Sequence, residues 1–224
     1  MNDKILQYYN DLAEQYDEDR FSHSYGKYID QQERQLLQGL LSQTKKEAVL
    51  DMACGTGRFL DMASYGIDIS PKMIEVAQRK YPNKQLSVQE ASQTHFPNAS
   101  FSTIFSFHLM MHLDKQQCFS IIDEAHRLLK PNGRLIFDIP SRARRQLMGY
   151  QYEGWHGSLD FFPKEMIQYR PDHWKVVAYQ GIAFFPIHRF PHGMRKSLIP
   201  LDTLLCQSIF KKWASYLVFT LEKK

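Results

Sequence analysis

The sequence predicts an α/β fold: an open, doubly wound and mostly parallel sheet of seven strands, with helices on both faces. Short apolar runs alternate with amphipathic helical patterns along residues 47–140, as parallel β–α–β units require. The first run ends at Asp51 and breaks into the turn Gly55-Thr56-Gly57. Ligands bind at the carboxyl ends of the strands in such sheets, so this turn marks a candidate binding site.

The expected helices follow from apolar spacing and capping signals. Apolar stripes predict helices over 3–16 and 27–42, and a short helix over 58–64. Ser70-Pro71 pairs an N-cap with proline at the first helical position, which predicts a helix ending near Lys80. Asp114 caps a further helix, and Lys130-Pro131-Asn132-Gly133 ends it. A later helix is expected to bury one face, formed by Leu201, Leu204, Leu205 and Ile209.

The strands are expected where apolar runs are bounded by turn signals. Their ranges are 47–51, 65–69, 85–89, 101–107, 134–139, 174–180 and 214–221. The first five alternate with helices. The last two read as a closing pair.

Composition limits the class of protein. The chain has 224 residues, 43% apolar and 23% charged, which predicts one globular domain with a substantial core. No signal peptide and no transmembrane segment is apparent. The three cysteines lack metal-ligand spacing. We therefore expect reduced thiols in a cytoplasmic protein, as a monomer or homodimer, with no metal site.

The charge is unevenly distributed. Residues 141–224 carry thirteen Lys and Arg against six Asp and Glu, whereas residues 1–50 carry six against nine. A basic last third is compatible with an anionic acceptor, a membrane surface or nucleic acid, and equally with a solvated face that has no partner. No dedicated nucleic-acid module is apparent.

The residues around the glycine turn favour a nucleoside that carries a positive charge. Asp68 ends the second predicted strand, where a carboxylate can accept both hydroxyls of a ribose. A dinucleotide fingerprint needs a third glycine at residue 60, which is Leu60. Asp51, just before the turn, suits a cation or an amine better than a pyrophosphate.

Four segments resemble successive motifs of the class I S-adenosylmethionine-dependent methyltransferases, and the small bacterial quinone- and lipid-type enzymes in particular. The segments are VLDMACGTGRFL, YGIDISPKMIEVAQ, VQEASQTHFPNASFSTIFSFHLMMHL and DEAHRLLKPNGRLIFD. The resemblance implies a Rossmann-like sheet whose last strand is antiparallel. It also implies S-adenosylmethionine as cofactor, S-adenosylhomocysteine as product, and no metal. The chain departs from the family pattern at Ala53, Glu90, Ser102 and Asn132.

The resemblance divides the chain by role and assigns individual positions. Residues 1–44 would form a helical lid, 45–140 the cofactor-binding core, and 141–224 the acceptor side with the closing strands. Asp51 would lie near the cofactor's amino group, Asp68 would bind the ribose, and Tyr16 would close over the cofactor. The turn would pack against the methionine part through Ala53, Gly55 and Gly57. The adenine would meet Ile69, Met73, Glu90 and Ala91, and the methyl end would meet Ser106 and Phe107.

Two histidines that follow the 101–107 strand, His108 and His112, are candidate general bases, although either could have a structural role instead. The expected acceptor is a small aromatic or lipid-like molecule, methylated on O or C. Aromatic residues after the fifth strand motivate this expectation: Tyr150, Tyr152, Trp155, Phe161 and Phe162. A solvated loop is the favoured interpretation of three nearby arginines: Arg142, Arg144 and Arg145.

Two alternatives from other functional classes remain open. The chain could be a catalytically silent regulator that binds the cofactor, which predicts binding without turnover. It could also be a methyltransferase that acts on RNA or protein through its basic last third, which predicts salt-dependent RNA binding.

Overall fold

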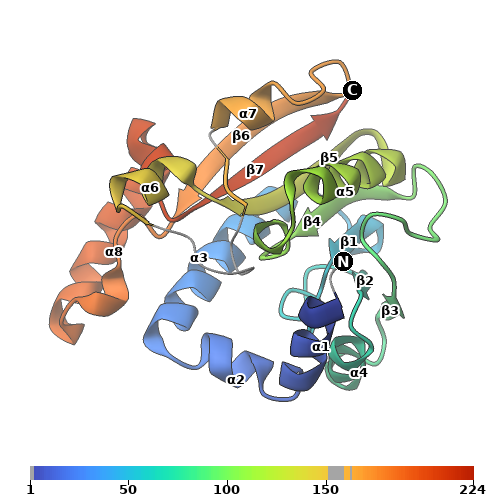
Figure 1. Ribbon diagram of the computed structural model, residues 1–224, viewed down its shortest axis with the longest axis horizontal. Coiled ribbons are helices and arrows are strands. Elements are labelled where there is room, and N and C mark those ends of the chain that lie inside the picture. Colours follow the sequence, from blue (N-terminus) through green and yellow to red (C-terminus); the bar gives the residue numbers. More distant parts are fainter. Residues whose placement is uncertain (1–2, 151–158, 162) are drawn as a thin grey trace.

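A computed structural model describes residues 3–150, 159–161 and 163–224. Within these residues the chain forms one seven-stranded sheet in the order β3-β2-β1-β4-β5-β7-β6 (Figure 1). The strands are β1 (Val49–Met52), β2 (Tyr65–Asp68), β3 (Gln85–Val88), β4 (Phe101–Ser106), β5 (Leu129–Pro140), β6 (Trp174–Ile182) and β7 (Tyr216–Lys223). Neighbours from β3 through β5 pair in parallel, while β7 pairs antiparallel with both β5 and β6. The predicted Rossmann-like fold with an antiparallel last strand is confirmed.

Helices cover both faces of this sheet. The helices are α1 (Asp3–Leu12), α2 (Tyr16–Phe21), α3 (Ser24–Leu41), α4 (Pro71–Lys80), α5 (Lys115–Leu128), α6 (Arg142–Leu147), α7 (Pro163–Ile167) and α8 (His192–Gln207). Short 3-10 turns occupy Lys46–Ala48, Met110–His112, Ile187–Arg189 and Ile209–Trp213. Strand β5 shows the two-sided core: Leu135 and Phe137 pack in the cluster that contains α5, and Ile136 packs in the cluster that contains α3 and α4.

The capping signals place two helices correctly at the site edge of the sheet. Ser70 Oγ accepts a hydrogen bond from the Met73 amide at 3.1 Å, which starts α4 directly after β2. Asp114 and Gln117 form a capping box that starts α5 after β4. The chain segments that leave β2 and β4 are therefore held at defined positions beside the binding site.

The N-terminal helix predicted over 3–16 is divided in two. Helix α1 ends at Leu12, and a turn with a 3.0 Å bond from the Gln15 amide to the Leu12 carbonyl leads to α2. The following helix begins at Ser24, earlier than expected, because His23 Nδ1 accepts from the Gly26 amide and caps it. The division puts Tyr16 at the start of its own helix.

The helix expected over 58–64 is absent, and that prediction was wrong. The segment is a series of turns, with bonds from the Leu60 amide to the Gly57 carbonyl and from Met62 to Phe59. Phe59, Leu60 and Ala63 are all buried, so the segment has no exposed face of the kind a surface helix needs. The short connection to β2 instead folds as a compact loop behind the glycine turn.

Helix α8 faces the opposite way from the prediction. Leu201, Leu204 and Ile209 are exposed, whereas Asp202 is fully buried. The Asp202 carboxylate accepts hydrogen bonds from four groups: the Tyr28 hydroxyl at 2.6 Å, the Gln32 side chain at 2.8 Å, the Phe185 amide at 2.5 Å and the Cys206 thiol at 3.6 Å. These donors satisfy the buried carboxylate and fix which side of α8 faces the body.

Strand β5 begins earlier than the 134–139 prediction. The segment expected as a turn lies within the strand as an irregularity. There the register with β4 moves from Phe101–Leu129 to Thr103–Arg134, and Asn132 has φ of 60°.

Among the described residues, no helix combines the length and the apolar character needed to cross a membrane.

Candidate cofactor and active site

The glycine turn after β1 adopts the left-handed backbone conformation that glycine favours. Ala53, Gly55 and Gly57 all have positive φ, at 67°, 54° and 88°. A Cβ added at Gly55 would meet no atom within 4 Å, so the turn is open to a ligand there. A Cβ at Gly57 would lie 2.9 Å from Leu60, so this glycine serves close packing instead.

Asp68 connects the end of β2 to this turn. One carboxylate oxygen accepts from the Gly55 amide at 2.9 Å, and the other accepts from the Ser70 amide at 2.8 Å. Burial raises the pKa of Asp68, although the hydrogen bonds from the backbone amides oppose that rise. The carboxylate is therefore fixed in place at the carboxyl end of β2, where it was expected to meet a ribose.

Asp51 adds a second buried acid behind the turn. Its side chain lies at the end of β1 and is almost inaccessible to solvent. Burial raises the pKa of Asp51 well above its ordinary value; Arg58 lowers it, and the nearby Asp68 raises it further. The buried Asp51 and the half-buried Asp68 place two acidic side chains near each other, which makes this region favourable for a ligand that brings a positive charge.

Most of the predicted residues line one pocket, which we call the cofactor pocket. They are Tyr16, Ala53, Gly55, Asp68, Ile69, Met73, Ala91, Phe107, His108 and His112. The lining also contains Tyr9, a tyrosine of the N-terminal segment expected to form the lid and pocket, and three residues that sequence reasoning missed: Ile5, Gln89 and Leu109. Ile5 and Tyr9 belong to the apolar stripe of the N-terminal helix, so that stripe was the available signal.

The other four predicted positions lie around the pocket without lining it. Asp51 lines an adjoining hollow together with Gly55 and His108. Glu90 is exposed, and its neighbour Gln89 lines the pocket in its place. Ser106 is buried at the end of β4, with no hydrogen-bond partner for its hydroxyl among the described residues. Gly57 packs behind the turn.

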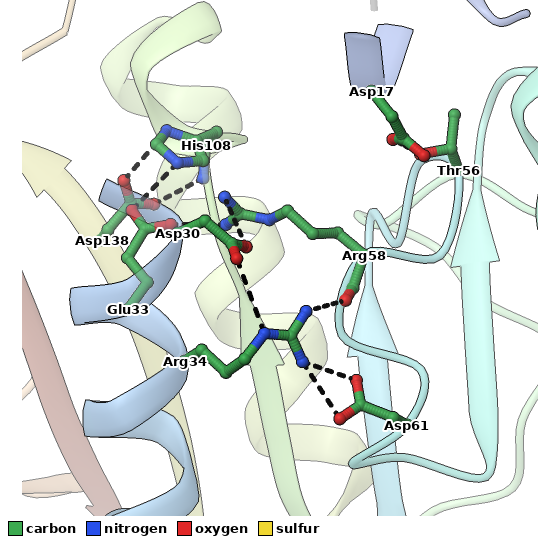
Figure 2. Close-up of polar contacts among 9 residues, drawn as sticks. All are labelled: Asp17, Asp30, Glu33, Arg34, Thr56, Arg58, Asp61, His108 and Asp138. Carbon is green, nitrogen blue, oxygen red and sulfur yellow. Dashed lines mark hydrogen bonds and ion pairs between the residues drawn. The ribbon is translucent and has the colours of Figure 1, made fainter. Parts of the chain in front are cut away.

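The N-terminal helices close over the cofactor pocket through specific polar contacts. The Tyr9 hydroxyl lies 2.9 Å from His112 Nε2, and Ser70 Oγ donates to Asn10 at 2.6 Å. Thr56 in the glycine turn donates to Asp17 at 2.5 Å (Figure 2). These contacts attach α1 and α2 to both strand ends that form the site.

A buried cluster of charged groups surrounds His108 (Figure 2). His108 Nε2 lies 2.9 Å from Glu33, its Nδ1 lies 3.6 Å from Asp138, and its amide donates to Asp138 at 2.6 Å. Arg58 donates to the other Glu33 oxygen at 2.5 Å. Burial would lower the pKa of His108, but Glu33 and Asp138 raise it above its ordinary value. His108 has φ of 60°, so this cluster holds it in an unfavourable backbone conformation.

Sequence reasoning missed Glu33 and Asp138, although both left a signal. Glu33 interrupts the buried face of α3 between Ile29 and Leu37, and Asp138 interrupts the apolar run of β5. With His108 they form a group whose ligand atoms are close enough to hold a metal ion. Arg58 and a protonated His108 balance the two carboxylates without one. The predicted absence of a metal stays a prediction.

The aromatic stretch after β5 does not line the cofactor pocket where it is described. Phe161 is fully buried in the core and packs against Phe119, with 6.0 Å between ring centroids. Tyr150 is exposed. Tyr152, Trp155 and Phe162 lie outside the described residues.

The sheet order, the glycine turn and the acid at the end of β2 define the class of protein as a Rossmann-like methyltransferase. A family model described as a methyltransferase domain matches residues 50–137. An uncharacterized protein of Methanocaldococcus jannaschii is 28% identical, over 98% of this chain and 90% of that protein. A demethylmenaquinone methyltransferase of Tropheryma whipplei is 30% identical, over 63% of this chain and 61% of its own length.

A solved structure shares the fold across nearly the whole chain. The magnesium protoporphyrin IX methyltransferase of Synechocystis, solved with bound S-adenosylhomocysteine, matches with a TM-score of 0.64 at 15% identity, covering 98% of this chain and 99% of that one. These findings support a class I S-adenosylmethionine-dependent methyltransferase, with the match to the family model at residues 50–137.

Proposed function

We propose that this chain transfers a methyl group from S-adenosylmethionine to a small aromatic or lipid-like acceptor, on oxygen or carbon. The observation that supports this acceptor is a second cavity that adjoins the cofactor pocket. Four residues of its lining also line a second cavity, the inner cavity, which leads towards Tyr25 and Tyr216. The shared residues are Tyr9, Tyr16, His108 and His112. An acceptor in the inner cavity would meet the cofactor where these four side chains gather.

The residues of the cofactor pocket fit S-adenosylmethionine. The open side of Gly55 accommodates a ligand against the backbone, Asp68 offers acceptor oxygens for a ribose, and Asp51 places a buried carboxyl group behind the turn. When bound, S-adenosylmethionine supplies an electrophilic methyl group on a sulfonium. The chain's own contribution is to orient the acceptor and to exclude water, which in favourable cases lowers a barrier by about 7–11 kcal/mol.

His112 is the better placed of the two candidate bases. Burial opposes protonation of His108, but Glu33 and Asp138 raise its pKa above the ordinary value, which makes this ring the weaker candidate to accept a proton. His112 instead faces the Tyr9 hydroxyl, whose pKa burial raises, so Tyr9 stays protonated and orients the imidazole. We propose that His112 accepts the proton of an acidic acceptor, while His108 positions the surrounding groups.

The similarity to a demethylmenaquinone methyltransferase supports an acceptor of the small-molecule kind. A cytoplasmic location, a monomeric or homodimeric state and the division into a lid, a core and an acceptor side stay predictions.

The proposed function is tested by calorimetry followed by methyl transfer. The protein should bind S-adenosylmethionine. With methyl-labelled cofactor, it should transfer label to members of a panel of phenols, quinols and hydroxy lipids. His112→Gln should lower the transfer rate at saturating cofactor about 10²–10⁴-fold. The exposed His95, changed to Gln, is the matched control and should leave the rate unchanged.

Other outcomes separate the alternatives. No binding of S-adenosylmethionine would contradict the enzyme assignment. Binding without transfer to the panel, to total RNA or to protein would favour the silent regulator. Label that enters RNA or protein alone would replace the small-molecule acceptor with a macromolecule.

A further inference from the structure

A third cavity, of about 660 Å³, lies beyond the inner cavity and is unusually basic. We call it the arginine cavity. Its cationic residues are Arg20, Arg144, Arg145 and Arg189, and its aromatic walls are Tyr8, Tyr25, Tyr150, Phe185, His188 and Tyr216. No Asp or Glu belongs to the lining formed by the described residues. The excess of cations over anions therefore gathers in a hollow of the molecule.

The arginine cavity is continuous with the site of methyl transfer. It shares Arg20, Tyr25, Met111 and Tyr216 with the inner cavity. Tyr216 in turn contacts His108, with 5.6 Å between ring centroids. A molecule that fills the inner cavity therefore extends naturally among the arginines, on the far side from the cofactor pocket.

Among the described residues, three of the four arginines have no carboxylate partner, and two of these, Arg144 and Arg189, have no side-chain hydrogen bond either. Arg145 pairs with Asp160 at 3.3 Å, and Arg20 donates to the Tyr8 hydroxyl at 3.1 Å. Arg144 and Arg189 have no carboxylate partner among the described residues. Arg142, which precedes Arg144 in α6, differs because it pairs with Asp160 at 2.7 Å and with Glu165 at 2.9 Å.

The charges of Arg144 and Arg189 affect Tyr25, which lies where the arginine cavity meets the inner cavity. Burial raises the pKa of Tyr25, but Arg144 and Arg189 both act to lower it, so each guanidinium lies within electrostatic range of this phenol. The Tyr25 ring packs against His188 at 4.4 Å between centroids and forms a flat aromatic wall. The same space therefore offers a surface for a planar group and two unpaired guanidinium groups for an anion.

We propose that the methyl acceptor is an anion: a planar, unsaturated molecule whose carboxylate or phosphate is bound by Arg144 and Arg189 in the arginine cavity. This inference rests on the proposed function and assigns the acceptor's chemical class. Arginine forks match carboxylate and phosphate oxygens in pairs, and charge-assisted bonds of this kind are about twice as strong as neutral ones. The acceptor's planar part then spans the inner cavity towards His112.

The test compares matched anionic and neutral probes on the protein saturated with S-adenosylhomocysteine. The probes are 2-naphthoate, 2-naphthyl phosphate and the neutral 2-naphthamide, titrated by calorimetry at pH 7.5 and low salt. We expect at least one acid to bind about tenfold or more tightly than the amide. Preference between the two acids identifies the anionic group.

Arginine variants test whether the predicted side chains are responsible. Arg144→Gln and Arg189→Gln should each weaken binding of the preferred acid about tenfold and leave the amide unaffected. Arg142→Gln, from the same helix and with the same change in charge, should alter acid binding by less than about threefold. All three variants should bind S-adenosylhomocysteine as the original chain does.

The possible failures are distinguishable. If S-adenosylhomocysteine does not bind, the proposed function fails and this inference fails with it. If it binds, but neither acid exceeds the amide or no probe binds, the anionic acceptor alone is overturned. The anionic acceptor is also overturned if Arg142→Gln weakens acid binding as much as the other two variants do.

Discussion

Asp68 joins two parts of the binding site that lie thirteen residues apart in the chain. Its two oxygens accept hydrogen bonds from the Gly55 and Ser70 amides, and the residue also lines the cofactor pocket. An acid that orders the turn and also receives the ligand has two roles. Both depend on having two acceptor oxygens, which no neutral side chain of this size provides.

We therefore expect Asp68→Asn to weaken binding of S-adenosylhomocysteine by about 100-fold, because one acceptor oxygen and the negative charge are lost. Calorimetry measures the change, and circular dichroism confirms that the variant is folded. Asp61→Asn is the matched control, since Asp61 pairs with Arg34 outside the cofactor pocket. A folded Asp68→Asn protein with less than a threefold loss would contradict the ribose assignment.

The neighbours Gln89 and Glu90 show the limit of motif matching at the scale of one residue. The motif placed Glu90 at the adenine edge, but Gln89 lines the pocket and Glu90 is exposed. Adjacent residues at the end of an extended segment face opposite sides, so an error of one position reverses the assignment. The turn carries less ambiguity, because the positive φ angles at Gly55 and Gly57 favour glycine.

Helix α1 lines the cofactor pocket, and we expect it to act as a cover. Ile5 and Tyr9 line the pocket from one side of the helix, and Asn10 accepts from Ser70 at the start of α4. The element has little other attachment to the sheet. Its stability therefore depends on the pocket beneath it, and a bound ligand adds contact area there.

Binding of S-adenosylhomocysteine should slow amide hydrogen exchange throughout α1 by about tenfold or more, since opening α1 would then expose the ligand. Mass spectrometry of peptides that cover residues 3–16 measures this effect. Helix α7, which is remote from the cofactor pocket, is the internal control and should exchange at an unchanged rate. Equal protection of the two helices, or none, would show that α1 is not a cover.

Elements were predictable where local signals and burial agree. The capping residues Ser70 and Asp114 correctly predict where α4 and α5 begin. The alternation of apolar runs with amphipathic helical patterns predicts the parallel sheet. Helix α8 was oriented wrongly because a stripe of leucines implied the buried face. The buried residue is Asp202, whose donors Tyr28 and Gln32 are about 170 residues away in sequence. The apolar spacing within α8 therefore could not indicate that Asp202 has partners elsewhere in the fold and is buried.

At the scale of the whole molecule, the charged cluster around His108 connects four parts of the chain. Glu33 comes from α3, Arg58 from the loop after β1, His108 from the end of β4 and Asp138 from β5. Asp30, Arg34 and Asp61 extend the series of opposite charges towards the surface (Figure 2). These contacts hold α3 against the site, so the cluster contributes to stability and to the shape of the inner cavity together.

Replacing His108 should destabilise the fold, because it leaves Glu33 and Asp138 buried with one cation fewer. We expect His108→Asn, which tolerates positive φ, to lower the free energy of unfolding by about 3 kcal/mol near pH 6. Urea titration at several pH values measures the difference from the original chain. His95→Gln, at an exposed position, should show no such difference.

The pH dependence of this difference has a defined sign. The pKa of His108 is raised by folding, so its contribution is complete below its ordinary value of 6.5 and is lost as pH rises through the raised pKa. The pKa of Glu33 is lowered by folding, so its contribution is present above 4.5 and is lost in acid. The original chain and His108→Asn should therefore differ most between about pH 4.5 and 6.5, and a difference that grows above pH 8 would contradict the ion pair.

The position of β7 has a consequence for the order of assembly. This strand lies between β5 and β6, yet it follows both of them in the chain, and it pairs with each along most of its length. Until residues 216–223 have been synthesised, β5 and β6 each keep an unpaired edge of main-chain donors and acceptors. The parallel strands β1 to β5 are complete earlier, so the antiparallel part of the sheet is expected to form last.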